Sequence, residues 1–375
     1  MVSGTGATNG GGGVAISVAL RTAVDVAARR GERAFVVGGM VRDLLMNRQV
    51  GDYDLDVVVE GDGIAFARDL GSALQASVRE HPPFLTAKLI APFGIASPSG
   101  DLLLSEVDVA TARQEIYEHP GALPTVTAAS IEKDLWRRDF SANAIALSLE
   151  AFQRYCAGSL RRELLVGELT DPCGGFADIS AATLKILHPK SFIDDPTRLF
   201  RAVRYLVRLS FHFDMATLAG FVEAVKSGAL STLSSRRVWN EVLVALDEEK
   251  PAEVIQEFAQ RGLFGQLPVV AADDPAWVLE SIENLEAIRH LIGPEMFRQA
   301  GRVIVVANLL RDGREDVVRA VHEGNKSIQR ASAVLNADAA PHDLRLIPDV
   351  AAAYCVHGTT ELRELLEACL REVSR

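Results

Sequence analysis

The sequence has little of what marks secreted, membrane-embedded or broadly nucleic-acid-binding proteins. Four cysteines in 375 residues, with no Cys-x-x-Cys spacing, predict reduced thiols and neither a disulfide framework nor a zinc site. The longest apolar runs, such as Val303–Leu310, are far shorter than the roughly 20 residues that cross a bilayer. A net charge of −11 excludes indiscriminate nucleic-acid binding through a globally basic surface. We expect a cytoplasmic protein that does not associate with membranes.

Residues 1–13 are rich in glycine and lack both the positive and the apolar segment of a signal peptide, so they are predicted to form a flexible tail. From residue 14 to about 170, short β-rich segments alternate with amphipathic helices, which predicts a mixed α/β domain. After residue 171 the periodicity is almost entirely helical. The fold class is therefore α+β. Strands are expected at 34–37, 55–59, 86–90 and 102–109, and helices at 14–30, 41–46, 64–74, 195–209 and 238–246.

Acidic residues precede one of the expected strands. Asp52, Asp54 and Asp56 alternate along the chain, so strand geometry would place their carboxylates on one face. The repulsion among three like charges is usually offset by a cation, and carboxylate oxygens suit Mg²⁺ or Mn²⁺. The alternative interpretation is a solvated acidic turn.

A glycine pair follows the first expected strand. Gly38 and Gly39 would let the backbone approach a ligand closely, and the next helix begins with free N–H groups that favour an anion such as phosphate. Arg42 could add a forked set of donors for phosphate oxygens. The alternative is a plain turn.

Two further segments combine arginine with acceptor side chains. The first is Arg137–Ala144, whose alternative interpretation is a surface ion pair. In the second, Asp194 or Asp195 is predicted to cap a helix that Pro196 begins. Four arginines then fall on one face of that helix and indicate a surface that faces phosphate. They are Arg198, Arg201, Arg204 and Arg208.

These segments occur in a recognisable order: GGMVRDLLMNR, DLDVVVEGDG, DVATARQE, RRDFSANAIAL, DPCGGFADI and DDPTRLFRAVRY. The set resembles the class II tRNA nucleotidyltransferase and poly(A) polymerase family, over roughly residues 33 to 210. The resemblance implies a nucleotidyltransferase head at 14–170, a helical neck at 171–235 that recognises the base, and a helical body and tail at 236–375 that bind RNA.

The resemblance also assigns roles to individual residues. Asp54 and Asp56 would bind two Mg²⁺ ions, and Asp108 would be the third catalytic carboxylate, although alternation puts Glu106 on the same face. The remaining implied positions bind the nucleotide: Gly38, Gly39 and Arg42 at the triphosphate, Arg138 at the nucleotide, Asp139 and Asn143 near the ribose, Asp195 and Arg198 at the base edge, and Arg201 and Arg204 toward the phosphates.

The implied activity is template-independent addition of CCA to the 3′ end of tRNA from CTP and ATP. Departures from the family pattern at Asn47, Ser141, Cys173 and Asp194 leave the choice of nucleotide open. The segment 117–134 also leaves this choice open, because it lies where the family has a flexible loop that helps switch from C to A addition. Arg236 and Arg237 are expected at a solvated surface, with phosphate contact as the alternative.

The alternatives that remain are a partial enzyme that adds only CC or only A, a poly(A) polymerase, and, from another class, a noncatalytic RNA-binding protein with a decayed head. A small-molecule adenylyltransferase would share the carboxylates but would not explain the arginine-rich helix. The sequence does not indicate an oligomeric state.

Overall fold

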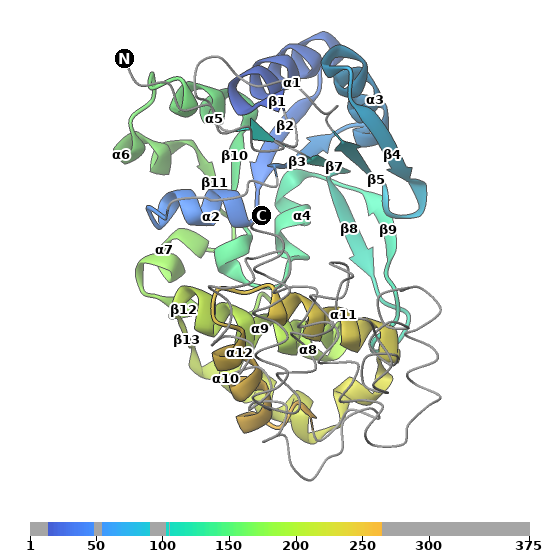
Figure 1. Ribbon diagram of the computed structural model, residues 1–375, viewed down its shortest axis with the longest axis vertical. Coiled ribbons are helices and arrows are strands. Elements are labelled where there is room, and N and C mark those ends of the chain that lie inside the picture. Colours follow the sequence, from blue (N-terminus) through green and yellow to red (C-terminus); the bar gives the residue numbers. More distant parts are fainter. Residues whose placement is uncertain (1–13, 49–54, 91–102, 105, 265–375) are drawn as a thin grey trace, which may run out of the picture. The chain divides into compact units, whose positions relative to one another are not determined.

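The computed structural model describes residues 14–48, 55–90, 103–104 and 106–264 (Figure 1). They form two compact units. Unit 1 contains the described residues up to 118 together with 123–189, and unit 2 contains 119–122 and the described residues from 190 onward. Residues 171–189, which the sequence assigned to the neck, lie in unit 1. The expected tail at 1–13 and most of the expected body and tail lie outside the described residues.

Unit 1 is built on a seven-stranded sheet with the order β11-β10-β2-β3-β7-β5-β4. In this sheet β3 and β7 are parallel, and the other neighbouring strands are antiparallel. All four expected strands lie in this part of the chain, with that at 102–109 divided between β6 and β7. The strands of the sheet are β2 (Arg33–Val37), β3 (Leu55–Glu60), β4 (Ser77–His81), β5 (Thr86–Ile90), β7 (Glu106–Thr111), β10 (Ala146–Ser148) and β11 (Leu169–Thr170).

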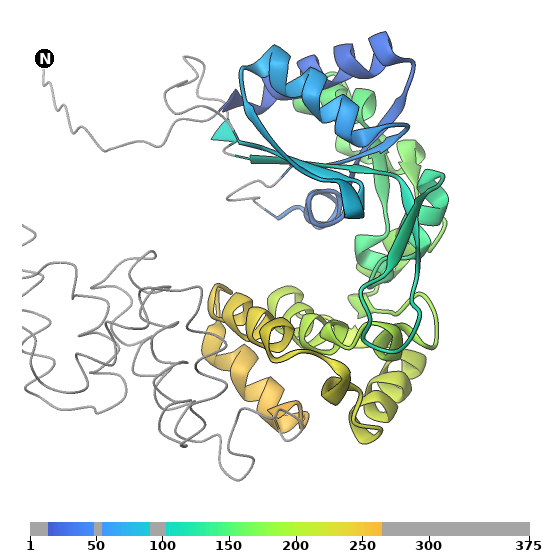
Figure 2. The ribbon, with the colours of Figure 1, turned by 90° about the vertical axis from the view of Figure 1, so that its right-hand side faces the viewer.

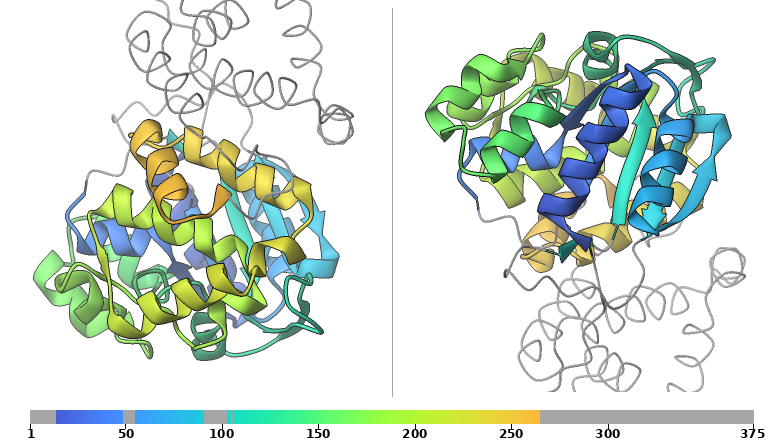
Figure 3. Two further views of the ribbon diagram at one scale, coloured as in Figure 1. Left: turned by 90° about the horizontal axis from the view of Figure 1, so that it is seen from below. Right: turned by 90° about the horizontal axis from the view of Figure 1, so that it is seen from above.

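Helices α1 (Ile16–Arg30) and α3 (Gly63–Leu74) pack side by side over one face of this sheet (Figures 2 and 3). The buried stripe of α1 is carried largely by alanines, which let the helix approach the sheet closely. Val18, which counted as apolar in the helical pattern, is 47% exposed. The stripe consists of Ala19, Leu20, Ala23, Val26 and Ala27.

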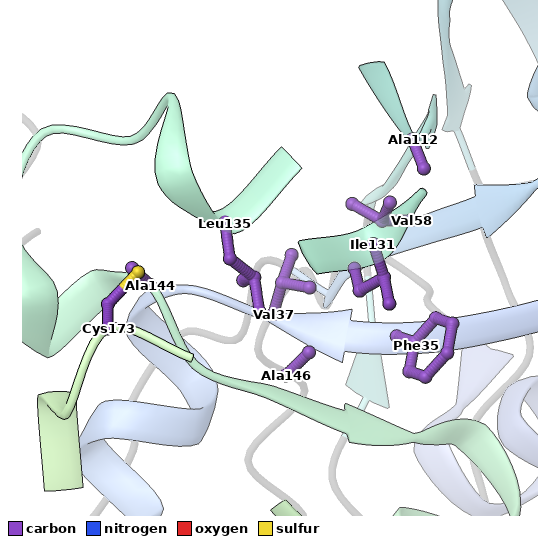
Figure 4. Close-up of a cluster of buried hydrophobic side chains, with 9 residues drawn as sticks. All are labelled: Phe35, Val37, Val58, Ala112, Ile131, Leu135, Ala144, Ala146 and Cys173. Carbon is purple, nitrogen blue, oxygen red and sulfur yellow. The ribbon is translucent and has the colours of Figure 1, made fainter. Parts of the chain in front are cut away.

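The opposite face of the sheet is covered by α2 (Gly39–Leu45) and α4 (Ile131–Trp136). Ile131 and Leu135 of α4 pack onto Phe35, Val37 and Val58 of β2 and β3 in one buried cluster (Figure 4). This packing fixes the position of the residues that directly follow α4, which include Arg138.

Residues 117–134 contain more regular structure than a loop. Strands β8 (Arg113–Ile116) and β9 (Thr125–Ala128) pair as a hairpin, and α4 begins three residues after it. The other elements of unit 1 are short: β1 (Val14–Ala15), which pairs with β6 (Leu103–Leu104), the 3-10 turns η1 (Pro82–Phe84), η2 (Ser141–Asn143) and η3 (Val166–Glu168), the helices α5 (Leu149–Cys156), α6 (Arg162–Leu165) and α7 (Gly175–Ser180), and β12 (Thr183–Leu184).

Unit 2 is helical in its described part, as the sequence predicted, apart from the short strand β13 (His212–Phe213). Its core contains edge-to-face aromatic pairs, including Phe200 with Phe258, whose ring centroids lie 5.1 Å apart. None of the helices in the described ranges is long and apolar enough to span a membrane. The helical elements are α8 (Ser191–Asp194), α9 (Thr197–Leu209), α10 (Met215–Lys226), η4 (Ala229–Thr232), α11 (Ser235–Leu246) and α12 (Pro251–Gln260).

Candidate functional site

Two carboxylates and a lysine form a row across three neighbouring strands of the unit 1 sheet. Asp56 in β3 is the Cα partner of Asp108 in β7, and Asp108 is the partner of Lys88 in β5. Residues paired in this way project to the same face of a sheet. The register therefore brings together two of the three expected carboxylates, while Asp54 lies outside the described residues.

Lys88 neutralises part of this acidic row. Its Nζ lies 3.1 Å from Asp108 Oδ2 and 2.5 Å from Glu106 Oε2, which shows that Glu106 and Asp108 share one face. Desolvation lowers the pKa of Lys88, but the hydrogen bonds that it donates to Glu106 and Asp108 outweigh this effect, and the pKa is raised. The lysine is therefore held in its charged form.

The acidic row lies on the face of the sheet that α4 covers. By alternation Asp56 shares this face with Val58, which packs against α4, and with Glu60, whose Oε1 accepts a 2.6 Å hydrogen bond from the Ile131 N–H. The carboxylates and the arginine that follows α4 are thus placed on the same side of unit 1.

Gly38 brings the backbone between that arginine and the carboxylates. It has φ +72° and ψ −135°, a conformation that only glycine adopts without strain. A Cβ at this position would lie 3.2 Å from Arg138 Nη1 and 3.8 Å from Asp56 Oδ2. The expected glycine turn, Arg138 and Asp56 therefore meet at one point.

Arg42 is buried, with 2% of its surface exposed, and braces α2 against the η2 turn. It donates to both carboxylate oxygens of Asp43 at 2.8 and 3.0 Å, and its Nη1 donates to Asn143 Oδ1 at 2.7 Å. Asn143 Nδ2 in turn donates to Asp139 Oδ1 at 3.0 Å. These three residues, which the sequence assigned separately to triphosphate and ribose, form one hydrogen-bonded chain.

The second pair of expected residues, Asp195 and Arg198, lies in unit 2. Helix α9 begins at Thr197 with Pro196 as its N-cap, so the prediction of Asp194 or Asp195 as N-cap was wrong. Pro196 already has helical dihedral angles, φ −65° and ψ −13°, and Asp195 supports the first turn from one residue earlier. Its Oδ1 accepts from the Thr197 N–H at 3.2 Å and the Thr197 hydroxyl at 2.7 Å.

Both members of this pair are oriented by neighbouring side chains. Arg198 Nη1 donates to the hydroxyl of the fully buried Ser191 at 2.6 Å. Arg237 in α11 donates at 2.8 Å to Asp195 Oδ1 and at 2.7 Å to the Gly121 carbonyl at the hairpin tip. Asp195 Oδ2 faces Arg198 Nε at 4.0 Å, beyond hydrogen-bond distance. Arg237, expected at a solvated surface, has a side chain that is 25% exposed and a guanidinium bound by these two acceptors.

The arginine face of α9 meets acidic residues of other segments. Arg204 is 9% exposed and donates to Glu248 at 2.9 Å and to Glu241 at 3.2 Å. Arg201 lies over the ring of Tyr205 and donates to its hydroxyl at 3.3 Å. Carboxylates from α11 and just beyond it therefore balance part of the charge that looked unopposed along a single helix.

No group of three or more histidine, cysteine, aspartate or glutamate side chains is arranged to hold a metal ion in the part of the chain that the structure describes. Asp56 and Asp108 nevertheless supply carboxylate oxygens on adjacent strands, and such oxygens are the ligands that Mg²⁺ prefers. The chemistry of this donor set fits magnesium.

One family of known proteins matches the part of the chain that carries these motifs. Residues 34–185, which carry the acidic row, the glycine turn and the Arg137–Ala144 segment, match the family described as the poly A polymerase head domain. Residues 34–185 are thus similar to the poly A polymerase head domain.

Relatives of this head domain are named for addition of nucleotides to tRNA. An A-adding tRNA nucleotidyltransferase of Geobacter sulfurreducens is 38% identical over 253 residues, which are 67% of this chain and 26% of the relative. A CC-adding tRNA nucleotidyltransferase of Deinococcus radiodurans is 33% identical over 242 residues, 64% of this chain and 57% of the relative. The chain thus spans about a quarter of the first relative and just over half of the second.

Among solved structures, a CCA-adding enzyme in an apo form matches with a TM-score of 0.63 and 26% sequence identity. The match covers 96% of this chain and 84% of the other. The fold class expected from the sequence, a mixed α/β head followed by helices, is confirmed by this likeness and by the head-domain match.

Sequence reasoning missed two residues around the candidate site of unit 1. Lys88 lies on an expected strand, but its pairing with Asp108 depends on which strands are neighbours. Asp134 precedes Arg137 and Arg138 by three and four residues, a helical spacing that predicts ion pairs, and this signal was available in the sequence.

Replacing Gly38 by alanine tests the close approach in the head domain. We expect the rate of the proposed reaction to fall roughly a hundredfold, because a Cβ 3.2 Å from Arg138 Nη1 would push that guanidinium out of place, while Asp56 Oδ2 would stay in ordinary contact at 3.8 Å. Steady-state kinetics would measure this loss. Gly174→Ala is the control for a glycine of positive φ: Gly174 also has φ +72°, with ψ 25° in the left-handed region, and its Cβ would meet nothing within 4 Å. If both variants lost the same fraction of the rate, backbone strain at a positive φ would account for the effect, and the prediction would be contradicted.

Proposed function

We propose that the chain transfers nucleotides from nucleoside triphosphates to the 3′ end of tRNA. The observation that carries this proposal is the meeting of Asp56 and Arg138 at the Gly38 turn, with Asp108 beside Asp56 in the sheet. Carboxylates and a guanidinium at a glycine turn are suited to a reacting triphosphate, because they can bind a divalent cation and phosphate oxygens side by side.

Within this proposal, Asp54, Asp56 and Asp108 would hold Mg²⁺. The bound ions supply activation of the primer hydroxyl and neutralise charge at the transferring phosphoryl group. Lys88 holds the carboxylate of Asp108 in place and limits repulsion within the acidic row. Gly38, Gly39, Arg42 and Arg138 would position the triphosphate; the residues near the ribose would be Asp139 and Asn143, which Arg42 already fixes.

Asp195 and Arg198 would recognise the edge of the incoming base in place of a nucleic-acid template. An acceptor beside a donor fork can match complementary groups on adenine or cytosine. The geometry supports this role because Thr197 and Arg237 bind Asp195 Oδ1, whereas Oδ2 is the oxygen on the side of Arg198. Arg201 and Arg204 would then act along the same helix, Arg204 from a buried position.

Two products are candidates. Full CCA addition from CTP and ATP is what the family resemblance of the sequence motifs implies, and the likeness to a CCA-adding enzyme structure supports it. Addition of the terminal A alone is favoured by the 38% identity with an A-adding relative, which exceeds the 33% identity with the CC-adding one.

The deciding experiment uses two primers, a tRNA that lacks its last three nucleotides and a tRNA that lacks only the terminal A. Each is incubated with the protein, Mg²⁺, and CTP, ATP or both, and the product length is read on a sequencing gel. Reactions with EDTA serve as blanks.

Growth by three nucleotides on the shorter primer would establish CCA addition. Growth by one only on the longer primer, with ATP, would establish A addition. Growth by two would identify CC addition, and a long A tail would identify a poly(A) polymerase. Absence of incorporation on both primers would contradict the proposal and leave a noncatalytic RNA-binding protein as the function to test.

Replacement of Arg237 by glutamine tests the orientation of Asp195. The variant loses the charged hydrogen bond from Arg237 to Asp195. We expect the KM for the nucleotide to rise about tenfold and the discrimination between ATP and CTP to fall. Arg261→Gln is the control, because Arg261 pairs with Glu257 elsewhere in unit 2. An unchanged ratio of kcat/KM for the two nucleotides would contradict the role given to Asp195.

A further inference from the structure

A buried carboxylate lies behind the arginine of the glycine turn. Asp134 in α4 has no exposed surface. Its Oδ1 accepts from the Arg113 N–H at 3.1 Å and from Arg137 Nε at 2.9 Å, and its Oδ2 accepts from Arg138 Nη2 at 3.0 Å and Nε at 3.3 Å. Desolvation raises the pKa of Asp134, but Arg138 and Arg137 outweigh it and the pKa is lowered. The carboxylate is therefore charged, and its donors come from three residues.

The contacts with Asp134 decide which edge of Arg138 points toward the site. Nε and Nη2 form one edge of the planar guanidinium, and Asp134 binds both. The remaining nitrogen, Nη1, is the atom that lies 3.2 Å from where a Gly38 Cβ would be. Because the fork is rigid, fixing one edge on Asp134 aims the other at the Gly38 turn and Asp56.

The same carboxylate connects Arg138 to the β8–β9 hairpin. The Arg113 N–H that binds Asp134 belongs to the first residue of β8. Arg137, bound to Asp134 by its Nε, donates through Nη1 to Glu115 Oε1 at 2.6 Å, and the Tyr117 hydroxyl donates to Glu115 Oε2 at 2.9 Å. A continuous set of charged hydrogen bonds therefore runs from the end of β8 to the guanidinium of Arg138.

We propose that Asp134 is a positioning residue for nucleotide binding: it fixes the guanidinium of Arg138 toward the triphosphate and links that orientation to the β8–β9 hairpin. This inference rests on the proposed nucleotidyl transfer. Asp134 touches neither nucleotide nor primer in this role, since it is fully buried behind the arginine.

The test compares Asp134→Asn with the unaltered chain in two measurements, the Kd for ATP by equilibrium dialysis and the KM and kcat for ATP with a primer tRNA. Asparagine keeps the shape but loses the charge and turns an N–H group toward the arginines. We expect the Kd and KM to rise about tenfold, with a smaller change in kcat, because a charged hydrogen-bond partner of Arg138 is lost.

Asp171→Asn is the matched control. Asp171 accepts from the Gly175 and Phe176 N–H groups at 2.7 and 2.9 Å, so its loss loosens unit 1 without touching Arg138. We expect its Tm to fall while its Kd for ATP stays within about twofold of the unaltered value, as for a substitution remote from the binding contacts. Weakening of ATP binding by Asp171→Asn equal to that by Asp134→Asn would overturn the inference.

A double-mutant cycle with Arg138→Lys separates positioning from a general loss of folding. If Asp134 acts through Arg138, Asp134→Asn adds little to the Kd once lysine has removed the fork, whereas additive effects would overturn the inference. Glu115→Gln is a second variant for the case in which Asp134→Asn does not fold. It should weaken ATP binding severalfold through Arg137, and unchanged binding would overturn the link to the hairpin.

The binding measurement also separates this inference from the proposed function. If the unaltered chain binds ATP but adds nothing to tRNA, the proposed function fails. The Kd of Asp134→Asn for ATP, compared with that of the unaltered chain, would still test the role of Asp134. If the unaltered chain does not bind ATP, both fail.

Discussion

Replacing Asp56 by asparagine should abolish nucleotide incorporation, with a loss on the order of a thousandfold or more. Asp56 is paired in register with Asp108, so its carboxylate is one of those that would hold Mg²⁺ at the transferring phosphoryl group. Loss of that interaction removes several kcal/mol of stabilisation from the transition state, and each 1.4 kcal/mol corresponds to roughly tenfold in rate. Incorporation of labelled ATP into primer tRNA would measure the loss.

A pair of neighbouring variants makes this prediction specific. Asp108→Asn should cause a loss of similar size, because Asp108 is the direct partner of Asp56. Glu106→Gln should cause a smaller loss, since Glu106 shares the face and Lys88 but is not paired with Asp56. Unchanged circular dichroism would show that each variant is folded. Retention of more than a tenth of the rate by Asp56→Asn, or a larger loss in Glu106→Gln than in Asp108→Asn, would contradict the assignment.

Replacing Arg204 by methionine should lower the free energy of unfolding by about 3 to 5 kcal/mol, as is typical when one partner of a buried ion pair is removed. The side chain of Arg204 is 11% exposed, and those of its partners Glu248 and Glu241 are 7% and 16% exposed. Methionine fills much of the volume but leaves two carboxylates without this guanidinium. Chemical denaturation followed by circular dichroism would measure the change.

The loss of stability in Arg204→Met should be larger at neutral pH than at acidic pH. Burial raises the pKa of Glu241, and Arg201 and Arg204 partly oppose this. A carboxyl group with a raised pKa contributes stability that is present at acidic pH and is lost as pH rises through that pKa. Without Arg204 the pKa rises further, so the variant should be most destabilised near neutral pH and should approach the unaltered protein on acidification.

Arg208→Met is the control on the same helix. Arg208 is 44% exposed and lies 3.8 Å from Glu248, and such pairs contribute about 1 kcal/mol or less. If Arg208→Met lowered the free energy of unfolding as much as Arg204→Met, burial of the ion pair would not explain the loss, and the prediction would be contradicted.

The sequence predicted the strands that form the centre of the sheet because burial leaves a clear pattern there. Four of the five residues of β2 are buried, and β7 alternates regularly between buried and half-buried positions. Strand β4 could not be found in this way, because its residues alternate between exposed and half-buried and none is fully buried. An edge strand needs only one neighbour, and polar side chains suffice for it.

In the candidate site, too, the residues in local motifs could be predicted from the sequence, whereas the contacts between distant segments could not. Gly38, Asp56 and Arg138 stand in local motifs, and the structure brings them together. The partners of Arg204 lie 37 and 44 residues further along the chain. Whether acidic or basic side chains surround Arg204 therefore depends on how α9 packs with later segments. Periodicity describes the face of one helix and contains no information about the charges that another element places against it.

The tip of the β8–β9 hairpin has a consequence for any attempt to divide the protein. Both strands belong to unit 1, but residues 119–122 between them belong to unit 2, so the chain passes from one unit to the other three times. The Gly121 N–H donates to the Asp194 carbonyl, and the Gly121 carbonyl accepts from Arg237. A fragment that stopped at Pro189 would keep the hairpin but lose both partners of its tip, and a fragment that began at Lys190 would lose the tip itself. A cut at this one peptide bond therefore leaves unit 1 whole but separates residues 119–122 from the rest of unit 2.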